Sequence, residues 1–112
     1  MNQKTYTVYI MTNKRHTTLY TGVTGDIEHR VHRHRAKIGS TFARKYKTRK
    51  LVYMEHFGQV WEAIAREKQI KAGSRADKIK LIETENPGWQ DLFETADADN
   101  HRRQESSSDE RP

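Results

Sequence analysis

The chain has 112 residues, no cysteine and a formal charge of +6, with 33% apolar and 32% charged residues. This length suits one domain with a modest core, and the lack of cysteine excludes disulfide scaffolds and cysteine zinc sites. No apolar run approaches the roughly 18 residues of a membrane span, and the first residues lack the apolar stretch of a signal peptide. We therefore expect a soluble cytoplasmic protein with no membrane partner.

The positive charge is concentrated in the body of the chain. The last 18 residues hold three arginines against five acids, which leaves 18 basic and 10 acidic residues in residues 1–94. Residues 26–56 alone carry nine Lys or Arg against three acids. Such a surface indicates either a polyanionic partner, most commonly nucleic acid, or a basic face that is simply solvated.

Two short strands with a polar connection are predicted at the N-terminus. Residues 6–11 are rich in β-branched and aromatic side chains, and residues 18–21 form a second run that Gly22 ends. A four-residue loop at 13–16 would set Tyr9 opposite Tyr20, so that the two phenol rings stand side by side on one face. The shortest plausible loop thus predicts a tyrosine pair.

Helical patterns dominate the rest of the chain. Thr24 is the expected cap of a helix that begins near Asp26, and residues 51–57 read as a third strand. A helix is predicted over residues 60–72, with Gly73 as its stop, and another from the capping-box pattern at 74–77 through residue 82. Trp89, Leu92 and Phe93 look like a closing apolar cluster.

This order of elements predicts the fold class. We expect a small α+β domain in residues 1–94, with a three-stranded antiparallel sheet flanked by helices in the order β-β-α-β-α-α. Residues 95–112 have little apolar content and a serine triplet, so we expect a disordered polar tail.

One acidic residue breaks the helical pattern. With about 100° between successive residues, Glu67 falls in the middle of the apolar stripe formed by Val60, Ile64, Ala63 and Ile70. A carboxylate there is costly unless it is paired or binds a metal. The alternatives are a rim position or an ion pair with a buried arginine.

The tyrosine pair, Arg30 and Glu67 together supply the groups that nuclease chemistry needs: a metal ligand, a proton acceptor and a cation for the phosphate. Each has a structural alternative, since tyrosines on strands commonly pack and arginines commonly lie on the surface. The histidines of residues 29–34 lack the i,i+4 spacing of a helical zinc motif, so this segment reads as a phosphate-facing basic helix.

At these residues the sequence resembles the GIY-YIG nuclease family. Residues 7–9 keep the final tyrosine of the Gly-Ile-Tyr triplet, residues 20–22 keep the tyrosine and glycine of the second triplet, and Arg30 follows at the family's spacing. Residues 67–71 are similar to the family's glutamate segment. The similarity spans about residues 4–93 and is greatest to a small stand-alone subgroup of uncharacterised bacterial proteins.

The resemblance implies an endonuclease that hydrolyses DNA phosphodiester bonds, in DNA repair or processing. It assigns Glu67 as the ligand of Mg²⁺ or Mn²⁺, Tyr9 as general base, Tyr20 as orienting group, Arg30 as phosphate ligand and His34 as an assistant in proton transfer. The residues expected to contact nucleic acid are Arg30, Arg33, Arg35, Arg44, Lys45, Lys47 and Lys71.

Two other functions compete with the nuclease. One is a nucleic-acid-binding module that keeps the scaffold and cleaves little or nothing, and the other is an interaction domain with an incidental basic face. DNA is the expected partner, with RNA left open, and a protein partner for targeting is plausible because the chain is short. The sequence leaves the oligomeric state undetermined.

Overall fold

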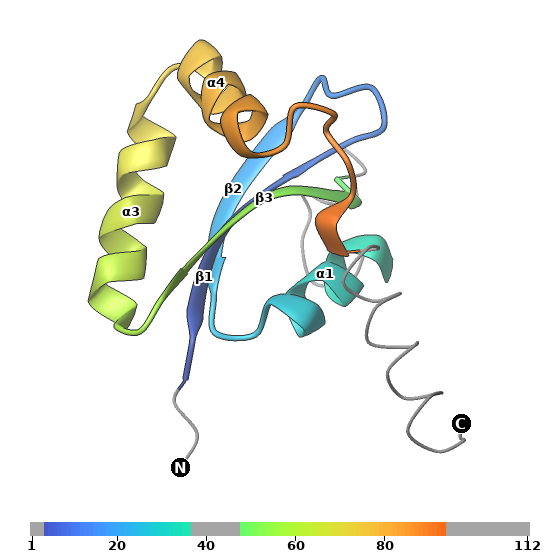
Figure 1. The fold of residues 1–112 in the computed structure, drawn as a ribbon. Coiled ribbons are helices and arrows are strands. Elements are labelled where there is room, and N and C mark those ends of the chain that lie inside the picture. Colours follow the sequence, from blue (N-terminus) through green and yellow to red (C-terminus); the bar gives the residue numbers. More distant parts are fainter. Residues whose placement is uncertain (1–3, 37–47, 94–112) are drawn as a thin grey trace.

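The computed structural model describes residues 4–36 and 48–93, apart from the side chains of residues 34 and 36. These residues form an α+β fold with a three-stranded antiparallel sheet and three helices (Figure 1). The elements are β1 (Tyr6–Thr12), β2 (Leu19–Thr24), α1 (Ile27–Ala36), β3 (Lys50–Phe57), α3 (Val60–Ala72) and α4 (Arg75–Glu85). The predicted fold class and element order are confirmed.

Strand β1 lies at the centre of the sheet, between β2 and β3. Tyr9 pairs with Gly22 and Met11 pairs with Tyr20, so the predicted register of the hairpin is wrong by two residues. The connection is longer than expected because the side chain of Asn13 accepts hydrogen bonds from the backbone N–H groups of Thr17 (2.9 Å) and Thr18 (3.1 Å). A shift of two residues keeps every side chain on its predicted face.

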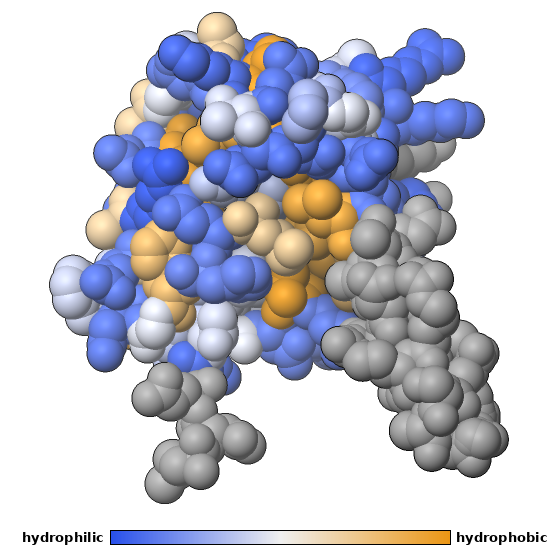
Figure 2. Space-filling view, viewed as in Figure 1, coloured by the Kyte–Doolittle hydropathy of each residue, from blue (hydrophilic) through white to orange (hydrophobic). Residues whose placement is uncertain are grey.

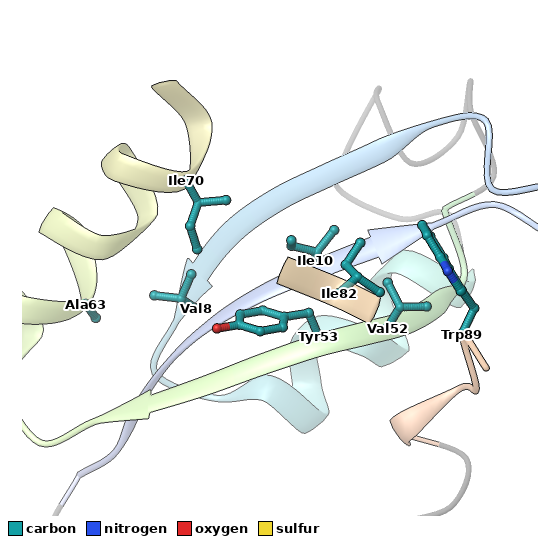
Figure 3. Packing of buried hydrophobic residues seen from close by; sticks show 8 residues of the cluster. All are labelled: Val8, Ile10, Val52, Tyr53, Ala63, Ile70, Ile82 and Trp89. Atoms are coloured by element: carbon teal, nitrogen blue, oxygen red, sulfur yellow. The ribbon is translucent and has the colours of Figure 1, made fainter. Parts of the chain in front are cut away.

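Helices α3 and α4 cover one face of the sheet. Val8 and Ile10 of β1 pack there against Ala63 and Ile70 of α3 and Ile82 of α4 (Figure 3). The consecutive residues Val52 and Tyr53 of β3 both join this cluster, since the pairing of β1 and β3 is irregular at Ile10 and Met11. Burial of these side chains anchors α3 across the sheet.

Helix α1 covers the opposite face, where Tyr9, Met11, Val31, Leu51 and Phe93 form a second cluster. Trp89 belongs to the first cluster and Phe93 to the second. The chain after α4 therefore contributes to both faces, and the single closing cluster predicted from the sequence is wrong.

Local hydrogen bonds fix the ends of the helices. Ser74 and Asp77 form the predicted capping box at the start of α4. At α1 the prediction needs correction, because Asp26, not Thr24, accepts from the backbone N–H of His29 (3.1 Å). The Thr24 hydroxyl instead accepts from the N–H of Asp26 (3.0 Å) and shapes the turn before the helix. Within residues 4–36 and 48–93, no helix has the length and hydropathy needed to cross a bilayer.

Candidate active site

The centre of the candidate site is the ring of Tyr9, which is fully buried at the middle of β1. Its paired residue on β2 is Gly22. A β-carbon built on Gly22 would lie only 2.5 Å from the Tyr9 hydroxyl and 2.6 Å from Cζ. The phenol ring therefore lies directly over the backbone of β2, and glycine is required there because any side chain would occupy the same space.

Tyr20 and Arg30 complete the group on the α1 side of the sheet. The rings of Tyr9 and Tyr20 are tilted by 33° with centroids 6.2 Å apart, which confirms that the two tyrosines share one face. The Nη1 atom of Arg30 donates to the Tyr9 hydroxyl at 3.4 Å. Because Val31 is buried, α1 is fixed in rotation, and Arg30 in its first turn reaches the tyrosine.

The surroundings of Tyr9 hold it in the neutral form. Burial, together with the neighbouring Tyr20, raises the pKa of Tyr9 to about 12, although the charge of Arg30 and its hydrogen bond act in the opposite direction. At neutral pH the group is a phenol that can accept one hydrogen bond and donate another. Arg30 is the cation that limits the cost of removing its proton.

Glu67 lies on the other side of the sheet, on α3. Its side chain is only 12% exposed, and its carboxylate pairs with Lys71 Nζ at 2.6 Å. The cost of placing a carboxylate on the apolar stripe is therefore offset by an ion pair with a lysine one turn further along the helix. Lys71 itself is 55% exposed and reaches the carboxylate from solvent.

The rotation of α3 shows which strand Glu67 flanks. Ala63 and Ile70 are buried against the sheet, and Arg66 lies to one side of them, where it donates to Glu55 of β3 at 2.9 Å. At about 100° per residue, Glu67 lies about 50° to the other side of this buried line. Helix α3 also contacts β2, so Glu67 flanks the edge strand β2.

The pairing of the strands places Glu67 along that edge. Glu55, the partner of Arg66, pairs with Val8, and Val8 pairs with Val23 on β2. Glu67 is the residue after Arg66 on α3, so it lies near this level of the sheet. The structure therefore brings Tyr9, Tyr20 and Arg30 together on the α1 side of β2 and places Glu67 on the α3 side of the same strand.

The site offers few protein ligands to a metal ion. The described residues contain no group of three or more His, Asp or Glu that could hold one. A single carboxylate suits Mg²⁺, which usually keeps several waters and takes one or two protein carboxylates. Since the partner of Glu67 is the mostly exposed Lys71, a divalent cation could displace that ammonium group without disturbing the core.

The remaining predicted residues have different environments. Arg33 is exposed on α1. The guanidinium of Arg35 forms an ion pair with Asp91 and lies over the ring of Phe93, so it ties α1 to the segment after α4. Four other predictions fall outside the described residues: Arg44, Lys45 and Lys47, and the side chain of His34.

Sequence reasoning missed the steric role of Gly22, because the predicted register placed Tyr20 opposite Tyr9. It also gave no role to Thr21, which pairs with Ile10 and therefore faces α3. Among the described residues, the Thr21 hydroxyl is the buried side-chain polar atom that lacks a hydrogen-bond partner. The third omission is the exposed Trp61. Its exposure could have been predicted, because it lies on the side of α3 opposite the buried residues Ala63 and Ile70.

These features define a small α+β domain with a tyrosine and arginine site at the edge strand of its sheet. The chain belongs to the GIY-YIG family, because residues 5–80 match the model of the GIY-YIG catalytic domain. That domain indicates a nuclease-type activity.

The relatives found in the comparisons are uncharacterised UPF0213 proteins. The UPF0213 protein of Staphylococcus haemolyticus is 41% identical over 76 residues, which cover 68% of this chain and 92% of the relative. That of Oceanobacillus iheyensis is 36% identical over 83 residues, covering 74% and 94%. The solution structure of the UPF0213 protein of Bacillus halodurans is 27% identical, with a TM-score of 0.52 over 79% of this chain and 93% of that one.

Proposed function

We propose that this protein is a metal-dependent, endonuclease-type hydrolase of DNA phosphodiester bonds that acts in DNA repair or processing. The observation that carries the proposal is the Arg30 guanidinium held at the hydroxyl of the buried Tyr9, at an edge strand that Glu67 flanks. A module that only binds DNA has no need of a carboxylate and a tyrosine pair around one strand. The family's catalytic domain supports the same activity.

Arg30 is the proposed phosphate ligand. A guanidinium has five N–H donors, and one of them is used by Tyr9, so the others remain for the oxygens of the scissile phosphate. Arg30 keeps its charge at any working pH and stabilises the charge that develops on the phosphate in the transition state. Loss of such a donor typically costs about 2.7–4 kcal/mol, or about 10²–10³ in rate.

Tyr9 is the proposed general base, and Tyr20 is proposed to orient it or the attacking water. With a pKa of about 12, fewer than about one Tyr9 in 10⁴ is ionised at neutral pH. In the proposal, the phenol oxygen therefore takes the proton of the attacking water while the phenol's own proton passes to a second base, for which His34 is the candidate. Arg30 favours this proton movement by its charge, and His34 one turn further along α1 is proposed to assist.

Glu67 is the proposed ligand of Mg²⁺ or Mn²⁺. When bound, such an ion supplies positive charge to the phosphate oxygens and lowers the pKa of a nearby water. Lys71 would leave the carboxylate if the ion took its place and would then be available for a phosphate. Together with Arg33, and with Arg44, Lys45 and Lys47, it forms the proposed basic surface for the DNA backbone.

The rival is a DNA-binding module without cleavage. Two observations favour it: the high pKa of Tyr9 and the lysine that already occupies the Glu67 carboxylate. The full chain should be incubated with labelled single-stranded, duplex and branched DNA, in Mg²⁺, in Mn²⁺ and in chelator. Binding without cleavage under every condition would identify the module.

A matched pair of variants tests the metal role in the same assay. Glu67→Ala should abolish cleavage, whereas Glu62→Ala should not, because Glu62 lies in the same helix but on its β3 flank. Equal cleavage by both variants would refute the role of Glu67. Binding should weaken steeply as salt is raised, because phosphate contacts release counterions.

A further inference from the structure

Helix α3 carries a group of exposed apolar side chains that neither the core nor the candidate active site explains. Among the described residues, the large hydrophobic side chains that stand exposed are Val60 (44%), Trp61 (66%) and Ile64 (38%). All three belong to the first two turns of α3. On the side where Figure 1 places α3, Figure 2 shows apolar spots set among hydrophilic ones.

Their arrangement on the helix is not random. At about 100° per residue, Val60 and Ile64 lie on the β2 flank of α3, and Trp61 lies beyond them on the outer surface. The exposed Lys68 follows Trp61 by seven residues and Ile64 by four, so the three side chains form one row. We call Val60, Trp61, Ile64 and Lys68 the tryptophan patch.

The tryptophan patch continues directly into the flank that carries Glu67. Trp61 and Glu67 are six residues apart, which is about 9 Å along a helix. Stacked nucleotides advance about 3.4 Å each along a strand. Trp61 also lies about 120° around the helix from Glu67, so a strand whose phosphate lies at Glu67 would reach Trp61 with a base three or more nucleotides away.

The chemistry of the patch selects one kind of occupant. An exposed indole is the side chain best suited to stack on a nucleobase, and a lysine in the same row attracts the backbone phosphates. A second copy of this chain fits poorly, because a stable interface needs about 20–30 residues a side and the patch has four. A base inside a duplex has no exposed face, so the occupant is an unpaired base.

We propose that the tryptophan patch is a binding subsite for an unpaired stretch of DNA next to the active site, in which a base stacks on Trp61 and a phosphate contacts Lys68. This inference rests on the proposed function for its substrate, and it adds that the protein acts on strands with unpaired bases. Strand ends, flaps and single-stranded regions then bind more tightly than continuous duplex.

The test is equilibrium binding of the full chain to a fluorescent single-stranded oligonucleotide in the presence of chelator, so that no cleavage takes part. Trp61→Ala should weaken binding about 5- to 100-fold, as expected for one stacked base, and Trp61→Phe should retain most of it. Lys68→Ala should reduce the salt dependence of binding, whereas Lys80→Ala on α4 serves as the matched control and should not. Because Trp61 is exposed, unfolding curves of its variants should match that of the wild type.

An oligonucleotide with abasic sites separates stacking from charge. The wild-type protein and Trp61→Ala should bind the abasic strand equally, since no base is present to stack. Equal binding of the normal strand by both proteins would overturn the inference. It would also be overturned if the effect of Trp61→Ala appeared only as reduced self-association of the protein in sedimentation. Trp61-dependent binding by a protein that never cleaves would refute the hydrolase and leave the subsite standing.

Discussion

The contact between Gly22 and Tyr9 makes Gly22→Ala an informative perturbation. The new methyl carbon would lie 2.6 Å from Cζ of Tyr9, whereas nonbonded carbons prefer about 3.5–4.0 Å. The ring must therefore move by about 1 Å, away from the position in which Arg30 reaches its hydroxyl at 3.4 Å. Overpacking of this kind costs about 1–3 kcal/mol, partly offset by about 0.4–1 kcal/mol from the stiffer unfolded chain.

We expect Gly22→Ala to lower the free energy of unfolding by about 1–2 kcal/mol in urea titrations and to reduce cleavage about 10²-fold, as a 1 Å misplacement of a catalytic group can do. Gly58→Ala is the matched control, since nothing lies within 4 Å of a β-carbon at that position. In a Tyr9→Leu background the cost of Gly22→Ala should fall to that of the control. An unchanged stability and rate for Gly22→Ala would refute the role assigned to this contact.

Three further predictions follow from single contacts. Tyr9→Phe should reduce the loss of stability at alkaline pH. The unfolded chain ionises Tyr9 near pH 10 and the folded chain only near pH 12. Between these pH values the wild type should therefore lose about 2–3 kcal/mol more free energy of unfolding than the variant, as measured by urea unfolding. Asp91→Ala should lower the free energy of unfolding by about 1–3 kcal/mol, because the carboxylate bonds Arg35 and the N–H of Phe93 (3.2 Å); a change below about 0.5 kcal/mol would contradict this. Lys71→Ala should raise the affinity for Mn²⁺ about two- to fivefold in calorimetric titration by freeing Glu67, whereas Lys68→Ala leaves it unchanged; equal affinities would argue against Glu67 as the ligand.

The face on which each strand residue lies could be read from the sequence, whereas the exact pairing could not. Alternation of side chains put Tyr9 and Tyr20 on one face, and that result survived a register error of two residues because the period of a strand is two. The error arose at the connection, where Asn13 supplies hydrogen bonds that substitute for a shorter turn. The contact of Tyr9 with Gly22 depends on the true register and was missed for that reason.

The candidate site was predictable in its residue types and only partly in its geometry. Helical spacing identified Glu67 as a carboxylate on the sheet-facing side of α3, and the structure shows it nearly buried. Spacing within one helix says nothing of which face of the sheet the helix covers, so the separation of Glu67 from Tyr9 by the strand β2 was not predictable. The ion pair of Arg35 with Asp91 links residues 56 positions apart, a distance over which local patterns carry no information.

The central claim is that Arg30 on one side of β2 and Glu67 on the other belong to a single active site. The most direct test is the rate of metal-dependent DNA cleavage by Arg30→Ala, Glu67→Ala and the double variant. Groups that act as a unit are strongly non-additive, so we predict that each single variant falls to nearly the same residual rate as the double variant. Two independent losses that multiply in the double variant would contradict the claim.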